Sequence, residues 1–120
     1  MLVLLLACSP ASPLVGESLT ADGTWLLRLA STSYDAGRAT LRVDAIRADA
    51  GEPAVDLRIF ALPDMEEMAH TLEVVDFSGA GDGSYSSELL FDMPGLWTLS
   101  GYAGDDNGTE AFHFVVAVAP

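Results

Sequence analysis

The feature that most constrains this chain is a series of short segments in which apolar and polar residues alternate, separated by clusters of Gly, Pro, Asp and Asn. Alternation with a period of two places successive side chains on opposite faces of an extended strand, so each segment is typical of a strand with one buried face. The glycine-rich residues 79–83 and the Asp-Met-Pro-Gly sequence at 92–95 predict turns, because glycine tolerates positive φ and proline restricts φ. No segment has the pattern of a helix of useful length. The predicted strands are residues 24–30, 38–48, 54–61, 71–77, 84–91, 96–102 and 111–119.

About seven short strands in one small domain favour an antiparallel β-sandwich. We therefore expect an all-β, immunoglobulin-like fold over residues 23–120. The alternation also predicts which side chains face inward and form the core. These are Trp25, Leu41, Val43, Val55, Leu57, Ile59, Trp97, Leu99, Phe112 and Phe114.

The N-terminal segment has a different character. Residues 2–7 are apolar and end at Ala7, directly before Cys8, the one cysteine of the chain. So short a run cannot span a hydrocarbon core of about 30 Å, and it predicts a signal peptide rather than a transmembrane helix. Its end resembles a bacterial lipobox, in which the cysteine becomes the lipidated first residue of the mature chain. We expect a signal segment at 1–7, then the lipidated Cys8 and a flexible tether over 8–22, which would attach the domain to a membrane of the bacterial cell envelope. The alternative is an ordinary hydrophobic N-terminus with a stray cysteine.

Charge excludes some partners. The chain has a net charge of −13, with 18 acidic residues, five arginines and no lysine. This balance argues against binding to nucleic acid and against docking on anionic lipid. It suits a soluble surface that attracts cations, although replacement of Lys by Arg in a GC-rich genome is the simpler explanation of the composition.

Soft metal ligands are concentrated in two predicted loops. Met65, Met68 and His70 fall within six residues of each other, and Met93 lies in the 92–95 turn. Thioether and imidazole groups together suit Cu(I), because soft sulfur discriminates against harder cations. In a sandwich whose successive strands reverse direction, these two loops and the 31–37 loop lie at the same end. The sequence therefore predicts a Cu(I) site formed by Met65, Met68, His70 and Met93.

A structural role is the alternative for these residues, because methionine in a loop over a small core usually fills a gap. His113 is predicted on the last strand, facing outward near the opposite end, and is left out of the site. Catalysis is not expected: the fold offers no free thiol, no Gly-x-Ser-x-Gly and only two histidines. The Asp-Asp-Asn-Gly sequence at 105–108 predicts a turn, since it lacks the spaced acids of a calcium loop.

Several of these motifs occur together in the order found in a known family. They are Gly-x-Trp at 23–25, Gly-Glu-Pro at 51–53, Met-Glu-Glu-Met-Ala-His at 65–70, Gly-Ser-Tyr at 83–85 and Phe-Asp-Met-Pro-Gly-Leu-Trp at 91–97. In this respect the chain resembles the YtkA-like/FixH-like family over about residues 23–103. The resemblance implies a small immunoglobulin-like envelope domain, often a lipoprotein, associated with copper handling and with assembly of haem-copper oxidases. The acidic Glu66 and Glu67 inside the methionine loop depart from the family pattern.

Two functions are consistent with these features. In the first, a lipid-anchored module binds or passes Cu(I) and works with envelope copper or oxidase-assembly proteins. In the second, the domain is a non-metal interaction or scaffold module whose turns are structural. Convergence of the methionine sulfurs and the His70 ring favours the first, and inward packing without a shared focus favours the second.

Overall fold

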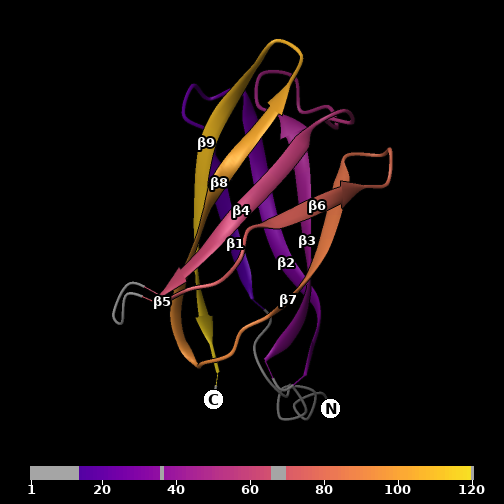
Figure 1. Cartoon of the computed structure of the whole chain (residues 1–120). Coiled ribbons are helices and arrows are strands. Elements are labelled where there is room, and N and C mark those ends of the chain that lie inside the picture. Colours follow the sequence, from indigo (N-terminus) through magenta and orange to yellow (C-terminus); the bar gives the residue numbers. More distant parts are fainter. Residues whose placement is uncertain (1–13, 36, 66–69, 120) are drawn as a thin grey trace, which may run out of the picture.

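The computed structural model describes residues 14–35, 37–65 and 70–119 and is built of antiparallel β-strands (Figure 1). The all-β prediction is therefore confirmed. The described strands are β1 (Val15–Leu19), β2 (Trp25–Asp35), β3 (Arg38–Arg47), β4 (Arg58–Met65), β5 (His70–Thr71), β6 (Val75–Gly79), β7 (Ser84–Leu90), β8 (Gly95–Asp105) and β9 (Gly108–Val118).

The order of pairing reproduces an immunoglobulin-like arrangement. Strands pair in the order β1-β2-β3-β7-β6-β4-β8-β9, and the short β5 pairs with β4. Apart from β1 and β5, the series β2-β3-β7-β6 and β4-β8-β9 correspond to the ABED and CFG sheets of a constant-type immunoglobulin domain. Because β6 pairs with both β7 and β4, it joins the two sheets along one side.

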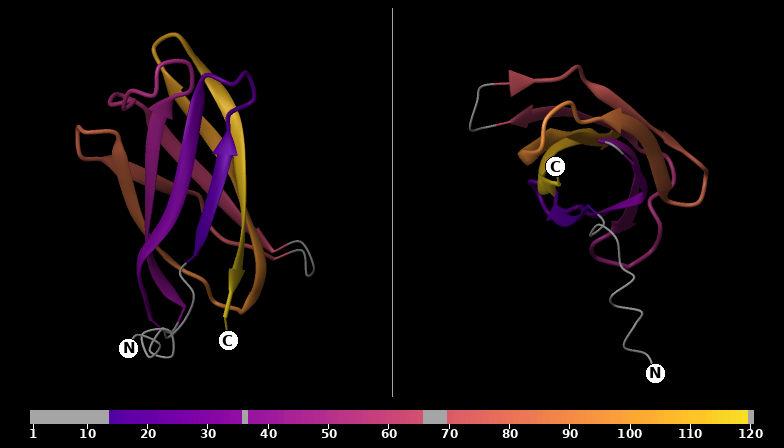
Figure 2. Two further views of the ribbon diagram at one scale, coloured as in Figure 1. Left: turned by 180° about the vertical axis from the view of Figure 1, so that it is seen from behind. Right: turned by 90° about the horizontal axis from the view of Figure 1, so that it is seen from below.

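The other side is nearly closed by β1, which lies beside β9 (Figure 2). The Ala21 amide donates a hydrogen bond to the Ala111 carbonyl oxygen at 3.0 Å. A Cβ on Gly16 of β1 would lie 3.0 Å from the ring of Phe114. Strand β1 falls within the predicted tether at 8–22, so that boundary is wrong. The folded domain begins before residue 23.

The core occupies the space between the two sheets. Nine of the ten predicted core side chains are buried, and the two tryptophans come from opposite sheets. Val55 is wrong: 43% of it is exposed. The confirmed core residues are Trp25, Leu41, Val43, Leu57, Ile59, Trp97, Leu99, Phe112 and Phe114.

Tyr85 explains why Val55 does not face the core. The buried Tyr85 hydroxyl donates a hydrogen bond to the Ala54 carbonyl oxygen at 2.6 Å and accepts one from the Leu57 amide at 3.0 Å. These bonds hold residues 54–57 outside the sheet, and β4 begins only at Arg58. The alternation of β4 therefore does not extend back to Val55. Burial raises the pKa of Tyr85, which keeps its hydroxyl proton available as a donor.

Candidate functional site

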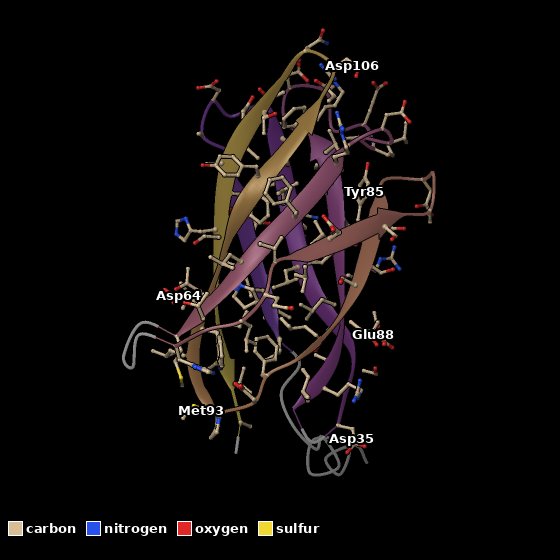
Figure 3. All side chains as sticks on the ribbon, viewed as in Figure 1. Asp35, Asp64, Tyr85, Glu88, Met93 and Asp106 are labelled. Atoms are coloured by element: carbon tan, nitrogen blue, oxygen red, sulfur yellow. The ribbon has the colours of Figure 1, made fainter. Side chains whose placement is uncertain are left out.

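Three of the predicted metal ligands, Met65, His70 and Met93, lie at one end of the molecule, which we call the Met/His end and define by these three residues. The end of β4, strand β5 and the turn between β7 and β8 meet there (Figure 1). Figure 3 places Met93 at the lower left with Asp64 above it, and Asp35, from the β2–β3 hairpin, at the lower right of the same end. Reversal of successive strands thus brings together loops that are distant in the sequence.

Met65 and His70 are direct partners in an antiparallel pair of strands. The sequence predicted both in a loop, but β4 extends to Met65 and β5 begins at His70. Side chains of directly opposed residues project from the same face of a ladder and lie close together. Met65 is 3% exposed, so this face is the one turned toward the core.

Asp92 fixes one nitrogen of the His70 ring. Nε2 of His70 lies 3.0 Å from each carboxylate oxygen of Asp92. The two side chains are 35% and 46% exposed, so the pair is open to solvent and forms an ion pair only when the imidazole is protonated. With Nε2 held by Asp92, Nδ1 is the nitrogen through which His70 would bind a metal. A carboxylate on the second nitrogen is the usual way that a metal-binding histidine is oriented.

Trp97 contacts both His70 on β5 and the turn between β7 and β8. The buried indole packs against the His70 ring in an edge-on arrangement, with ring centroids 5.8 Å apart. Its Nε1–H donates a hydrogen bond to the backbone oxygen of Met93 at 3.0 Å. Phe91 packs on the same indole at 5.3 Å, and Met93 is half-buried against the core. Residues 91–93 of the turn are thereby held beside His70.

Three of the four predicted ligands thus lie at one end of the core, while Met68 and the predicted lipidation site Cys8 lie outside the described residues. His113 projects outward on β9 opposite Ser100, on the outer face of the sheet. Over residues 14–35, 37–65 and 70–119, no three His, Cys, Asp or Glu side chains form a group that could hold a metal. Among the described residues of the Met/His end, the soft ligand groups are the thioethers of Met65 and Met93 and the imidazole of His70, a combination that suits Cu(I).

Sequence reasoning did not identify Asp92. It lies 22 positions after His70, and only the fold shows that the two meet. Its place directly before Met93 in the turn was the available signal.

Comparisons with known proteins do not identify a family for this chain. No helix in the described part of the chain is long and apolar enough to cross a membrane. No protein-family model matches the chain, and no curated protein and no solved structure matches it either.

Proposed function

We propose that this chain is a membrane-anchored envelope module that binds Cu(I) at the Met/His end. The observation that carries the proposal is the orientation of His70. Its Nε2 is held by Asp92, while its strand partner is Met65 and its ring packs on the Trp97 indole that fixes Met93. These contacts place His70 beside Met65, five residues earlier in the chain, and beside the backbone of Met93 in the β7–β8 turn, which supports one imidazole and two thioethers as candidate ligands.

The chemistry of the groups supports a soft monovalent ion. Thioethers bind Cu(I) well and harder divalent cations poorly, and a neutral imidazole completes such a set. Met68 would add a third thioether. Met65 and Trp97 are buried, so the side of the site that faces the core is apolar, while His70 and Asp92 are open to solvent.

Anchoring and partners form part of the same proposal. Lipidation of Cys8 would hold the domain on an envelope membrane, where its copper could pass to other copper proteins or to a haem-copper oxidase under assembly. The motifs shared with the YtkA-like/FixH-like family support this assignment. Catalysis is not part of it.

Anaerobic titration with Cu(I), in competition with a chromophoric chelator, tests the metal site. We expect His70→Ala and Met93→Leu each to weaken Cu(I) binding at least about tenfold, since each removes a ligand. Asp92→Asn should weaken it by about 10- to 100-fold, the usual effect of losing the group that orients a metal-binding histidine. His113→Ala is the matched control, and its affinity should equal that of the unchanged protein.

The same titration separates the proposal from the scaffold alternative. The burial of Met65 and the packing of Met93 are also what a structural role requires. Unchanged Cu(I) binding in the His70 and Met93 variants would place the site elsewhere. Loss of the cooperative unfolding transition in both variants would make these side chains structural and favour a non-metal interaction module.

A further inference from the structure

The outer face of the β4-β8-β9 sheet differs from the outer face of the opposite sheet. When one face of an antiparallel sheet packs on a core, outward positions are normally polar. Strand β3 follows this rule, with Arg42 and Asp44 outward. The outward positions of β4 instead carry Phe60 and Leu62, and β8 adds Tyr102. These three side chains are 37%, 38% and 48% exposed.

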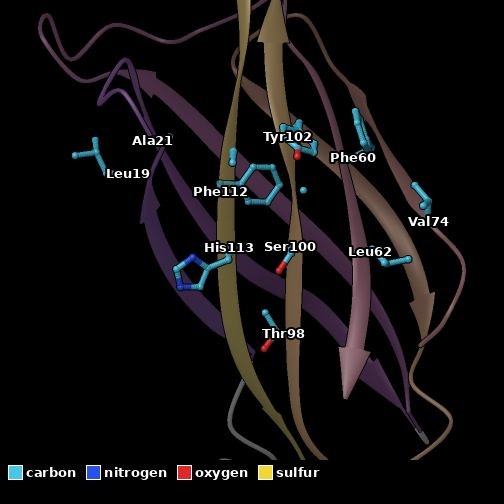
Figure 4. Close-up of a pocket in the computed structure, with 12 residues that line it drawn as sticks. Leu19, Ala21, Phe60, Leu62, Val74, Thr98, Ser100, Tyr102, Phe112 and His113 are labelled. Atoms are coloured by element: carbon cyan, nitrogen blue, oxygen red, sulfur yellow. The ribbon is translucent and has the colours of Figure 1, made fainter. Parts of the chain in front are cut away.

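A groove of about 900 Å³ crosses this face (Figure 4). Phe60 and Tyr102 pack together on one side of it, with ring centroids 5.8 Å apart. Val74, in the segment before β6, and Leu19, at the end of β1, extend its apolar lining. Of the described residues that line the groove, none has a carboxylate, ammonium or guanidinium group. Thr98, Ser100 and His113 are the polar residues of the lining. On a chain with a net charge of −13, a mostly apolar exposed surface without carboxylates is typical of a binding site.

Acidic side chains flank this groove beside β4 and β6. Asp76 is the direct strand partner of Phe60, so it projects from the same face. Asp64 lies farther along the outward row of β4, and the exposed Glu73 precedes β6. Arg58 lies at the other end of that row, so the described residues of β4 and of the 73–76 segment contribute three acidic groups and one basic group to this flank. A ligand seated in the groove therefore meets apolar surface at its centre and net negative charge at its margin.

We propose that the groove binds a segment of another protein that is apolar at its centre and flanked by Lys or Arg side chains. Burial of the apolar centre would supply affinity, and the acidic flank would attract and orient the basic groups. A second copy of this chain fits poorly, because it would bring its own acidic flank and a further net charge of −13. Anionic lipid is repelled for the same reason. The lining of the groove contains none of Met65, His70 and Met93, and binding there does not require copper; the acidic flank reaches the Met/His end at Asp64.

Isothermal titration of the full chain with two capped peptides tests the inference. The probe is Lys-Lys-Leu-Phe-Leu-Lys, and its counterpart is Glu-Glu-Leu-Phe-Leu-Glu. We expect the basic peptide to bind at least about tenfold more tightly than the acidic peptide. Its affinity should fall as salt rises from about 0.05 to 0.5 M, because exposed charges are screened.

Matched variants locate the binding surface. The double variant Phe60→Ser/Leu62→Ser should lose at least about tenfold in affinity for the basic peptide, while Leu90→Ser, which removes an exposed apolar side chain from β7, should change nothing. A second pair of variants removes three negative charges, either beside the groove or elsewhere on the surface. Removal of the three charges beside the groove should weaken binding of the basic peptide several-fold more than removal of the three charges elsewhere. The two sets are Asp64→Asn/Glu73→Gln/Asp76→Asn and Asp35→Asn/Glu88→Gln/Asp106→Asn.

Three results would overturn the inference. The first is that the basic peptide does not bind. The second is that the two triple variants bind it equally, which would reduce binding to general charge attraction. The third is a dimer in sedimentation equilibrium that Phe60→Ser/Leu62→Ser dissociates, because the occupant would then be a second copy of the chain. Thermal unfolding followed by circular dichroism checks that each variant keeps its fold.

Discussion

Glu110 illustrates how one side chain on β9 organises a distant part of the chain. Its carboxylate accepts hydrogen bonds from the Thr20 hydroxyl at 2.6 Å, from the Asp22 amide at 3.0 Å and from the hydroxyl and amide of Thr24. These donors belong to the turn between β1 and β2. Burial by itself would raise the pKa of Glu110, but the hydrogen bonds from Thr20, Thr24 and the backbone together lower it. The ionised form is therefore the one that the fold favours.

The lowered pKa of Glu110 predicts a pH-dependent contribution to stability. A carboxyl group whose pKa is lower in the folded state stabilises the fold above its unfolded-state pKa, and this contribution is lost as pH falls through the folded-state value. Its ordinary value is 4.5, so the loss begins below about that pH. Glu110→Gln should reduce the free energy of unfolding at pH 7, and the difference from the unchanged protein should shrink toward pH 3. Urea unfolding across this range measures both proteins. A difference that is constant with pH would show that the ionised carboxylate is not what matters.

At the scale of strands, the alternation of apolar and polar residues was sufficient to predict those strands that bury one face and expose the other. It predicted β2, β3, β7, β8 and β9, and inward residues on all of them except β7, because each of these strands packs one face on the core. The pattern did not predict β1, which is short and partly exposed along its length. It is held by its pairing with β2 and by the hydrogen bonds of Glu110 to the turn that follows it. Residues 71–77 were predicted as one strand but divide into β5 and β6, whose pairing with β4 lies at different places along it. The local alternation of apolar and polar residues does not determine which strands pair with each other, because pairing depends on the tertiary fold.

The candidate site was predictable to a similar degree. Alternation of loop ends was enough to place Met65, His70 and Met93 at a common end of the molecule. It did not predict that Met65 is the buried last residue of β4, or that Asp92 binds the His70 ring. Both depend on where β4 ends and on how the β7–β8 turn folds back, which are consequences of tertiary packing.

Gly101 on β8 gives a prediction at this scale. It is the strand partner of Ala61 on β4, and a Cβ at this position would lie 1.8 Å from the Phe60 carbonyl oxygen. Backbone, not a flexible side chain, would have to move, and the β4–β8 pairing joins the middle of the second sheet. Gly101→Ala should lower the free energy of unfolding by more than about 2 kcal/mol, whereas the neighbouring exposed Ser100→Ala should change it by less than about 0.5 kcal/mol. Equal effects in urea unfolding would mean that the two strands can separate there at little cost.

For the whole molecule, the important feature is that β1 covers the edge of each sheet, at β2 in one and at β9 in the other. It pairs with β2 over its whole length and lies beside β9, so it covers strands that would otherwise expose unpaired backbone groups. Leu14 and Thr20, on either side of β1, are buried as well. The segment that the sequence indicated as a tether therefore completes the fold, and its loss should affect both stability and association.

Removing residues 1–20 tests this, with removal of residues 1–13 as the control that leaves β1 in place. The longer deletion exposes the edges of β2 and β9, removes buried Leu14 and Thr20, and takes one of the donors from Glu110. We expect it to lower the free energy of unfolding by more than about 2 kcal/mol, since several buried contacts are lost together. Open strand edges also pair between molecules, so sedimentation velocity should reveal larger species for this variant. The control should unfold as the full chain does and should not form these larger species. If the longer deletion also matched the full chain in both measurements, β1 would be dispensable and the strands from β2 to β9 would form the stable unit without it.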